Sequence, residues 1–547
     1  MKISLPALLA LALAAPTMAA ADAPDSDPDL VELFEEYLEW EEDGAPGLGH
    51  PPTRERLERR RQALGTFQER LAELDGDQRE PSREVDFLAV RARMDQQDFM
   101  LNHVRPWARD PGFYSDPLQR LAFTELPVED EDDRDKLHDH LAAIPDWLEL
   151  ARDRLRDGAA DYADLALHNL RQPDGVGHGH PYRETPPKGV IGWYRDFLER
   201  ADDHQPELVE AGDRALAAIE EFADWLESAR PDMEAQAGVG AEAFDWYLRQ
   251  VALLPHDGDE VVNLARRELE RTRAFYALER HRNRDLPELE LPETEDEYLA
   301  RIESVDRRIR AFLEAEDFIT VPDHIPDDFR EMGFNVPWIE RPDGPNYWEQ
   351  VQYRDPSPDH WHAVIPGHRF DGRMAATVDH PIRRHVSDAA RIEGWALYVE
   401  EAPLQLGFYD EHPRTRELIY NFALFRAART IGDVELQRNE MTADEAVEFW
   451  MEHTPWLDED VARVDAEIYL RRPPGYGLSY TIGAFQLYRL LADRQRQLGD
   501  DFNLRDFHDH IMTAGRIPLS LLRYEMTGLD DEIRRLRDHV PLDEAGF

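Results

Sequence analysis

Histidine side chains are concentrated between residues 360 and 401, in HWHAVIPGHRFDGRMAATVDHPIRRHVSDAARIEGWALYVEE. The five histidines are His360, His362, His368, His380 and His385. Glu393 and Glu400 follow, seven residues apart and so on one face of a helix. Two histidines and a glutamate from a later helix can hold zinc through nitrogen and oxygen ligands. The alternative is that these are ordinary surface or core histidines of a polar protein, and spacing alone favours that interpretation.

The spacing of His362 and His368 needs a break in the helix if both are to reach one ion. Six residues place them about 120° apart around an ideal helix and roughly 9 Å apart along it. Zinc–nitrogen bonds are only about 2.0–2.1 Å long. Pro366 and Gly367 lie between them, and Pro366 has no N–H for the His362 carbonyl, so the helix must bend or end there.

Other catalytic and metal-binding signatures are weak or absent from the sequence. There is no cysteine, so disulfides, cysteine zinc sites and cysteine nucleophiles are excluded. Ser479 lies in no G-x-S-x-G context, and neither a phosphate loop nor G-x-G-x-x-G occurs. His178 and His180 form an H-x-H in a glycine-rich segment, which is more often a surface loop than a metal site.

The elements that must position these residues are mostly helical. Val262, Ala265, Leu269, Thr272 and Tyr276 step by three and four residues along one helix face. Alternation in WEQVQY predicts a strand over residues 348–353, and residues 319–321 are a second candidate. We therefore predict one large α-rich domain over residues 29–547, built around a central cleft, with a small β-sheet near residues 319–355. Its N-terminal helical half extends to about residue 315, and its motif-bearing half covers residues 316–547.

The charge of the chain excludes some partners. Its 547 residues include 63 Lys or Arg and 115 Asp or Glu, which gives a net charge of −52. Binding to nucleic acid or to an anionic membrane surface requires excess cations and is not expected. An acidic chain whose cations are nearly all arginine is typical of a halophilic protein, although a GC-rich genome gives a similar bias.

The N-terminus, MKISLPALLALALAAPTMAAADAPDSD, predicts export. Lys2 precedes an apolar stretch, and Ala19 and Ala21 form an A-x-A cleavage pattern before Asp22. We expect a signal peptide over residues 1–21 and a disordered mature start over residues 22–28. An uncleaved anchor is the alternative, but Pro6 and Pro16 interrupt the apolar stretch. Since no cysteine is available for lipidation, we expect a periplasmic or secreted protein that leaves the membrane after cleavage.

Four segments together resemble the bacterial family named domain of unknown function 885. They are HAVIPGHRFD at 362–371, EGWALYVEE at 393–401, PPGYGLSYTIG at 473–483 and FHDHIMTAGRIPL at 507–519. The family pattern reads HExxPGHHxQ, EGWALYxE, a PGQALSY-type stretch and an FHDxxLxxGxxPL-type tail. The resemblance covers nearly the whole mature chain.

The resemblance implies a helical scaffold similar to zinc peptidases of the HExxH-plus-Glu type. By it, His362, His368 and Glu393 would be the metal ligands. Tyr480 would donate a hydrogen bond to a developing oxyanion, and Arg472 would anchor substrate.

The departures from the family pattern fall at the expected active site. Ala363 occupies the position of the general base, and Arg369 replaces the second histidine of the family pair. Asp371, Gln437 and Tyr476 also differ from the family residues. Two hypotheses follow: a non-catalytic relative that binds a peptide or protein in the cleft, or a zinc-dependent hydrolase that uses another base, such as Asp371 or Glu400.

Overall fold

Side-chain caps fix where many of the helices begin. The Asp257 side chain accepts a hydrogen bond from the backbone N–H of Glu260. In return, the Glu260 carboxylate accepts one from the backbone N–H of Asp257. Thr442 and Glu445 form the same pair. These two caps begin α11 (Gly258–Arg282) and α19 (Ala443–His453).

The computed structural model describes residues 26–42, 44, 46–74, 80–172, 187–341 and 344–547. The predicted signal peptide, residues 22–25 of the predicted mature start, and His178 and His180 lie outside these ranges. The first helix begins at Pro28, inside the segment predicted to be disordered. No helix among the described residues is long and apolar enough to cross a membrane.

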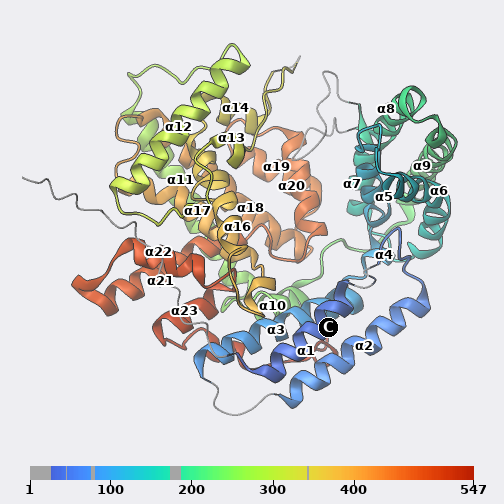
Figure 1. Cartoon of the computed structure of the whole chain (residues 1–547), viewed down its shortest axis with the longest axis horizontal. Coiled ribbons are helices and arrows are strands. Elements are labelled where there is room, and N and C mark those ends of the chain that lie inside the picture. The colour runs from blue at the N-terminus through green and yellow to red at the C-terminus, as the bar shows by residue number, and fades with distance from the viewer. Residues whose placement is uncertain (1–25, 43, 45, 75–79, 173–186, 342–343) are drawn as a thin grey trace, which may run out of the picture.

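The N-terminal half forms two groups of helices, which Figure 1 shows in blue and in teal to green. The first group is α1 (Pro28–Glu42), α2 (Arg54–Glu73) and α3 (Pro81–Phe99). The second is α4 (Pro106–Arg109), α5 (Gly112–Ala122), α6 (Glu131–Arg154), α7 (Ala160–Arg171), α8 (Gly189–His204) and α9 (Val209–Ala229). After them come α10 (Ala241–Gln250), α11 and α12 (Glu295–Ala315).

The motif-bearing half continues as helices. They are α13 (Phe329–Met332), α14 (Tyr347–Arg354), α15 (Ser357–Asp359), the π-helical turn η4 (His360–Val364), α16 (His368–Ala375), α17 (Ala389–Gln405), α18 (Pro413–Gln437), α19, α20 (Glu459–Arg471), α21 (Ser479–Leu498), α22 (Leu504–Thr513), α23 (Leu519–Thr527) and α24 (Ile533–Leu536). The helix pairs with the most extensive contacts are α11 with α18 and α17 with α21. The predicted α-rich class is confirmed.

The predicted small β-sheet near residues 319–355 is wrong. The described residues contain isolated β-bridges but no strand. The WEQVQY segment lies in α14, which Asn346 and Glu349 begin with another reciprocal cap. Tyr347 and Val351, four residues apart, are both buried, so the helical period determines which face packs inward. The alternation of polar and apolar residues in this segment therefore does not indicate a strand. The N-x-x-E pattern of Asn346 and Glu349 indicates the start of a helix.

Candidate metal centre

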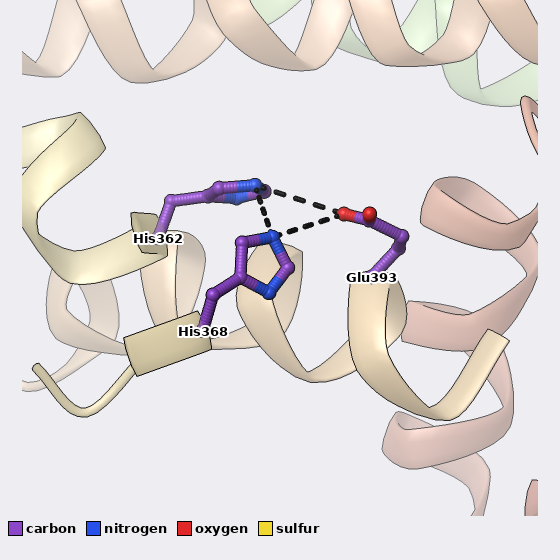
Figure 2. Close-up of side chains that lie close together, drawn as sticks. All are labelled: His362, His368 and Glu393. Atoms are coloured by element: carbon purple, nitrogen blue, oxygen red, sulfur yellow. Dashed lines mark hydrogen bonds and ion pairs between the residues drawn. The ribbon is translucent and has the colours of Figure 1, made fainter. Parts of the chain in front are cut away.

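Three side chains from separate elements converge on one point, as Figure 2 shows. His362 lies in η4, His368 begins α16, and Glu393 lies in the second turn of α17. The Nε2 atoms of the two histidines are 3.1 Å apart. Glu393 Oε2 lies 3.2 Å from His368 Nε2 and 3.8 Å from His362 Nε2. One ligand atom from each residue lies within 4.8 Å of the others, close enough for all three to bind one ion.

The chain reverses between the two histidines, as their spacing required. His360 O accepts from the N–H of Ile365, which closes the π-helical turn before the chain passes Pro366 and Gly367. A Cβ on Gly367 would overlap the carbonyl of His362, so only glycine fits this close approach. Trp395, from the EGWALY segment, donates to Pro366 O at 2.8 Å and fixes the reversal against α17.

Glu393 is positioned by the crossing of α17 and α21. The next residue, Gly394, is so close to α21 that an added Cβ would lie 2.6 Å from the Cα of Gly483. Tyr476, just before α21, donates from its hydroxyl to Glu393 Oε1 at 2.7 Å. The second oxygen of Glu393 is buried, and its polar neighbours are the two imidazoles, with His368 Nε2 at 3.2 Å and His362 Nε2 at 3.8 Å. It is directed at the two imidazoles.

The electrostatics of the three residues suit cation binding. Burial acts to raise the pKa of Glu393, but the nearby imidazoles of His368 and His362 and the Tyr476 hydroxyl outweigh it and lower the pKa to about 2. Burial, with the neighbouring His368 and Arg426, lowers the pKa of His362 well below its usual value. At neutral pH the site therefore presents a carboxylate and a neutral His362, the forms that bind metal.

A buried carboxylate orients His362 from the side away from the cluster. Glu400 Oε1 lies 2.6 Å from His362 Nδ1 and 2.7 Å from a guanidinium nitrogen of Arg426. Burial raises the pKa of Glu400 to about 7, so the carboxylate is ionised above that pH. In the ionised form it can only accept, which places the hydrogen on Nδ1 and leaves the Nε2 lone pair toward His368 and Glu393. A carboxylate on the outer nitrogen of a ligating histidine is a common feature of zinc sites.

One side of the cluster is open to solvent. The His368 side chain is 29% exposed, against 9% for His362 and 7% for Glu393. Burial acts to lower the pKa of His368, but the carboxylate of Glu393 outweighs it and raises the pKa. A ligand would therefore approach from the side of His368.

The other three histidines of the stretch do not join the cluster. His360 Nε2 lies 2.9 Å from the buried carboxylate of Asp306. His380 Nε2 lies 3.4 Å from Asp86, and His385 accepts from Arg384. These three have partners outside the cluster, a difference that residue spacing alone could not show.

Both residues predicted to assist catalysis lie beside the cluster. The ring of Tyr480 is buried and lies nearly parallel to the imidazole of His362, with centroids 6.3 Å apart. Arg429 lies over the same ring at 4.7 Å. Arg472 is exposed and places its guanidinium 4.4 Å from the ring centroid of Tyr476. Tyr480 is therefore buried next to the cluster, and Arg472 lies at the protein surface near it.

The residues that depart from the family pattern have structural roles here. Ala363 is buried, with 5% exposure, among apolar side chains. Arg369 donates to the carbonyls of Met332 and Phe334, which excludes it as a ligand in this conformation. Asp371 is buried, and its two oxygens accept from Arg391 at 3.0 Å and from Arg516 at 2.8 Å.

Sequence reasoning missed two parts of the site. Arg426, in the middle of α18, pairs with Glu400. The signal in the sequence is an arginine that lies among mostly apolar residues of this helix. Tyr476 was recognised as a departure but not as a partner of Glu393. Asp433 accepts from the N–H of Leu478 and so supports the turn that carries Tyr476.

Two solved bacterial structures are similar in fold to this chain. A protein from Shewanella oneidensis, described as "a putative lipoprotein of unknown function", aligns with a TM-score of 0.69 at 15% identity, over 91% of this chain and 98% of the other. A "putative lipoprotein" from Colwellia psychrerythraea aligns with a TM-score of 0.63 at 17% identity, over 88% and 90%. No curated protein matches the chain.

The chain belongs to the family described as "Bacterial protein of unknown function (DUF885)", whose profile matches residues 47–360 and 360–526. The membership predicted from the four segments is therefore confirmed. At the identities above, the two solved structures establish a shared fold only.

Proposed function

We propose that the chain binds one zinc ion through His362, His368 and Glu393. The observation that carries this proposal is the convergence of the three ligand atoms, with Glu393 Oε2 buried and otherwise unpaired. Two imidazole nitrogens and one carboxylate oxygen are a donor set used by catalytic zinc, with a fourth position left for another ligand. Zinc bound there would supply Lewis acidity toward a carbonyl group.

We further propose that the chain is a zinc-peptidase-like protein with an impaired site, which binds a peptide or protein segment without efficient hydrolysis. Ala363 cannot accept a proton. Asp371 has both oxygens in ion pairs, and Glu400 is committed to His362 and Arg426. Using either carboxylate as a base would break contacts that hold the site together. The alternative, a metal-dependent hydrolase that recruits one of them, is therefore the less favoured function.

The surroundings of the cluster suit a bound peptide. Tyr480 could donate a hydrogen bond to a carbonyl oxygen held at the cluster, and Arg472 is exposed beside Tyr476 to pair with a carboxylate. The N-terminal sequence supports export to the periplasm or medium, where peptides are abundant, after removal of residues 1–21.

Metal analysis of the purified protein tests the zinc site. After zinc loading and gel filtration, we expect one zinc per chain, and much less in His368→Ala. The matched control is His324→Ala, which alters an exposed histidine outside the cluster and should retain one zinc. Equal zinc in all three proteins, or none in the wild type, would contradict the ligand assignment.

Incubation with a mixed peptide library, with and without chelator, separates the two functions. An impaired site should bind peptides while leaving the library essentially intact. Hydrolysis that stops when the chelator is added would instead establish the hydrolase.

A further inference from the structure

A cavity of about 400 Å³ adjoins the cluster, and Glu393 and Tyr476 form part of its wall. Its other walls come from α3 and α10, from the start of α17, and from the loop at Pro473 that leads into α21. Glu393 is therefore shared by the cluster and the cavity wall, although neither histidine ligand lines the cavity. Something bound at the cluster could extend a side chain into it.

Small and apolar side chains create the space. They are Ala89 and Ala92 from α3, Ala389 and Ala390 from α17, and Pro473 and Pro474 from the loop. An apolar cavity of about 150 Å³ is enough to hold a benzene ring. A volume of about 400 Å³ therefore accommodates a leucine or phenylalanine side chain together with part of the adjoining backbone.

The polar groups of the wall disfavour an anionic occupant. Arg93 is paired with Glu41 at 2.6 Å and also donates to the carbonyl of His385. Gln96 donates to the hydroxyl of Tyr247 at 2.8 Å. The carboxylates of Asp388 and Glu393 contribute negative charge, and burial raises the pKa of Asp388 to about 6. Among the described lining residues, no cation is left to pair with an incoming carboxylate.

We propose that this cavity receives an uncharged, apolar side chain of the bound peptide, on the residue whose carbonyl group lies at the His362–His368–Glu393 cluster. The inference rests on the proposed zinc site, because the metal is what anchors the carbonyl end. Full burial of a leucine or phenylalanine side chain strengthens binding by roughly 10- to 100-fold relative to glycine. A glutamate side chain gains nothing, since it would be desolvated beside carboxylates.

The test uses the zinc-loaded full chain and four probes, N-acetyl-glycyl-X-hydroxamates with X as glycine, leucine, phenylalanine or glutamate. Each hydroxamate can anchor at the zinc, so the probes differ only in the side chain offered to the cavity. By calorimetric titration we expect the leucine and phenylalanine probes to bind roughly 10- to 100-fold more tightly than the other two. Equal affinity for all four probes would overturn the inference.

Two variants that fill the cavity sharpen the test. Ala92→Phe and Ala389→Phe should abolish the advantage of the apolar probes over the glycine probe. Ala389 is only half-buried, so its variant remains informative if Ala92→Phe does not fold. The control Ala217→Phe alters an exposed alanine of α9 and should retain the wild-type preference. An unchanged preference in a folded cavity variant would also overturn the inference.

Zinc content measured on the same samples separates the two failures. A protein that takes up no zinc contradicts both the proposed function and this inference. A protein that binds zinc and all four probes equally contradicts the cavity assignment alone.

Discussion

Replacing Glu400 tests whether the site is organised as a metal centre, because this carboxylate touches His362 without being one of the three assigned ligands. Its Oε1 lies 2.6 Å from His362 Nδ1, and the side chain is completely buried. In Glu400→Gln the amide oxygen can still accept from Nδ1, but without charge. In Glu400→Ala the acceptor is absent.

Loss of such an outer partner typically weakens metal binding by roughly 10- to 100-fold. At about 1.4 kcal/mol per tenfold, this is about 1.4–2.8 kcal/mol of zinc-binding free energy. We expect Glu400→Gln to fall near the lower end and Glu400→Ala near the upper end. Both should also lower the melting temperature, since Arg426 would keep a buried charge without its carboxylate.

Competition with a chromogenic zinc chelator measures the affinities, and Glu401→Gln is the matched control. Burial raises the pKa of both Glu400 and Glu401 to about 7. Glu401, however, accepts from Tyr488 at 2.9 Å and shows no hydrogen bond or ion pair to either ligand histidine. Its variant should bind zinc like the wild type. Identical affinities for wild type, Glu400→Gln and Glu400→Ala would refute the view that Glu400 orients His362.

Four further outcomes can be checked on the same protein. Gly394→Ala should lower the free energy of unfolding in urea by about 1–3 kcal/mol, because the new Cβ would meet the Cα of Gly483 at 2.6 Å; an unchanged midpoint would contradict this crossing. Zinc affinity should fall as the pH is lowered through the raised pKa of His368, since the protonated ring cannot ligate; a loss that begins only well below the ordinary value of 6.5 would contradict the shift. The melting temperature should rise between about 0.01 M and 1 M salt, because the screening length falls from roughly 30 Å to 3 Å and weakens the self-repulsion of a net charge of −52. A melting temperature that stays constant or falls over this range would argue against salt adaptation. If only the base is missing, Ala363→Glu should produce chelator-sensitive peptide hydrolysis at a rate roughly 10²- to 10⁴-fold above the wild type, with Ala363→Gln as the control. A folded, zinc-bound variant that cleaves nothing would show that the defect extends beyond residue 363.

The helical class could be predicted from sequence because it rests on local periodicity and caps. The 348–353 strand failed for an equally local reason, since six residues of alternating polarity are too few to outweigh the cap at Asn346 and Glu349. A strand also needs a partner, and the sequence contained no evidence for one.

The candidate site was only partly predictable. The ligand triad could be named through the family resemblance, but periodicity argued against His362 and His368 sharing an ion. Their approach depends on long-range contacts that no spacing encodes, such as Trp395 on the Pro366 carbonyl. For the same reason, the sequence could not show that Asp371, a candidate base, forms ion pairs with Arg391 and Arg516.

The structure retains everything that positions a cation, while the residue expected to move a proton is absent. Gly367, Gly394 and Gly483 allow the close approaches that bring the three ligand atoms together. Burying Glu400 and Arg426 has a free-energy cost, because desolvation outweighs their ion pair and raises the pKa of the Glu400 carboxyl to about 7. A fold that had lost its ligand would gain stability by replacing these groups with apolar ones. The pair beside Ala363 therefore favours the proposed function, in which the site binds a metal and a ligand without efficient hydrolysis.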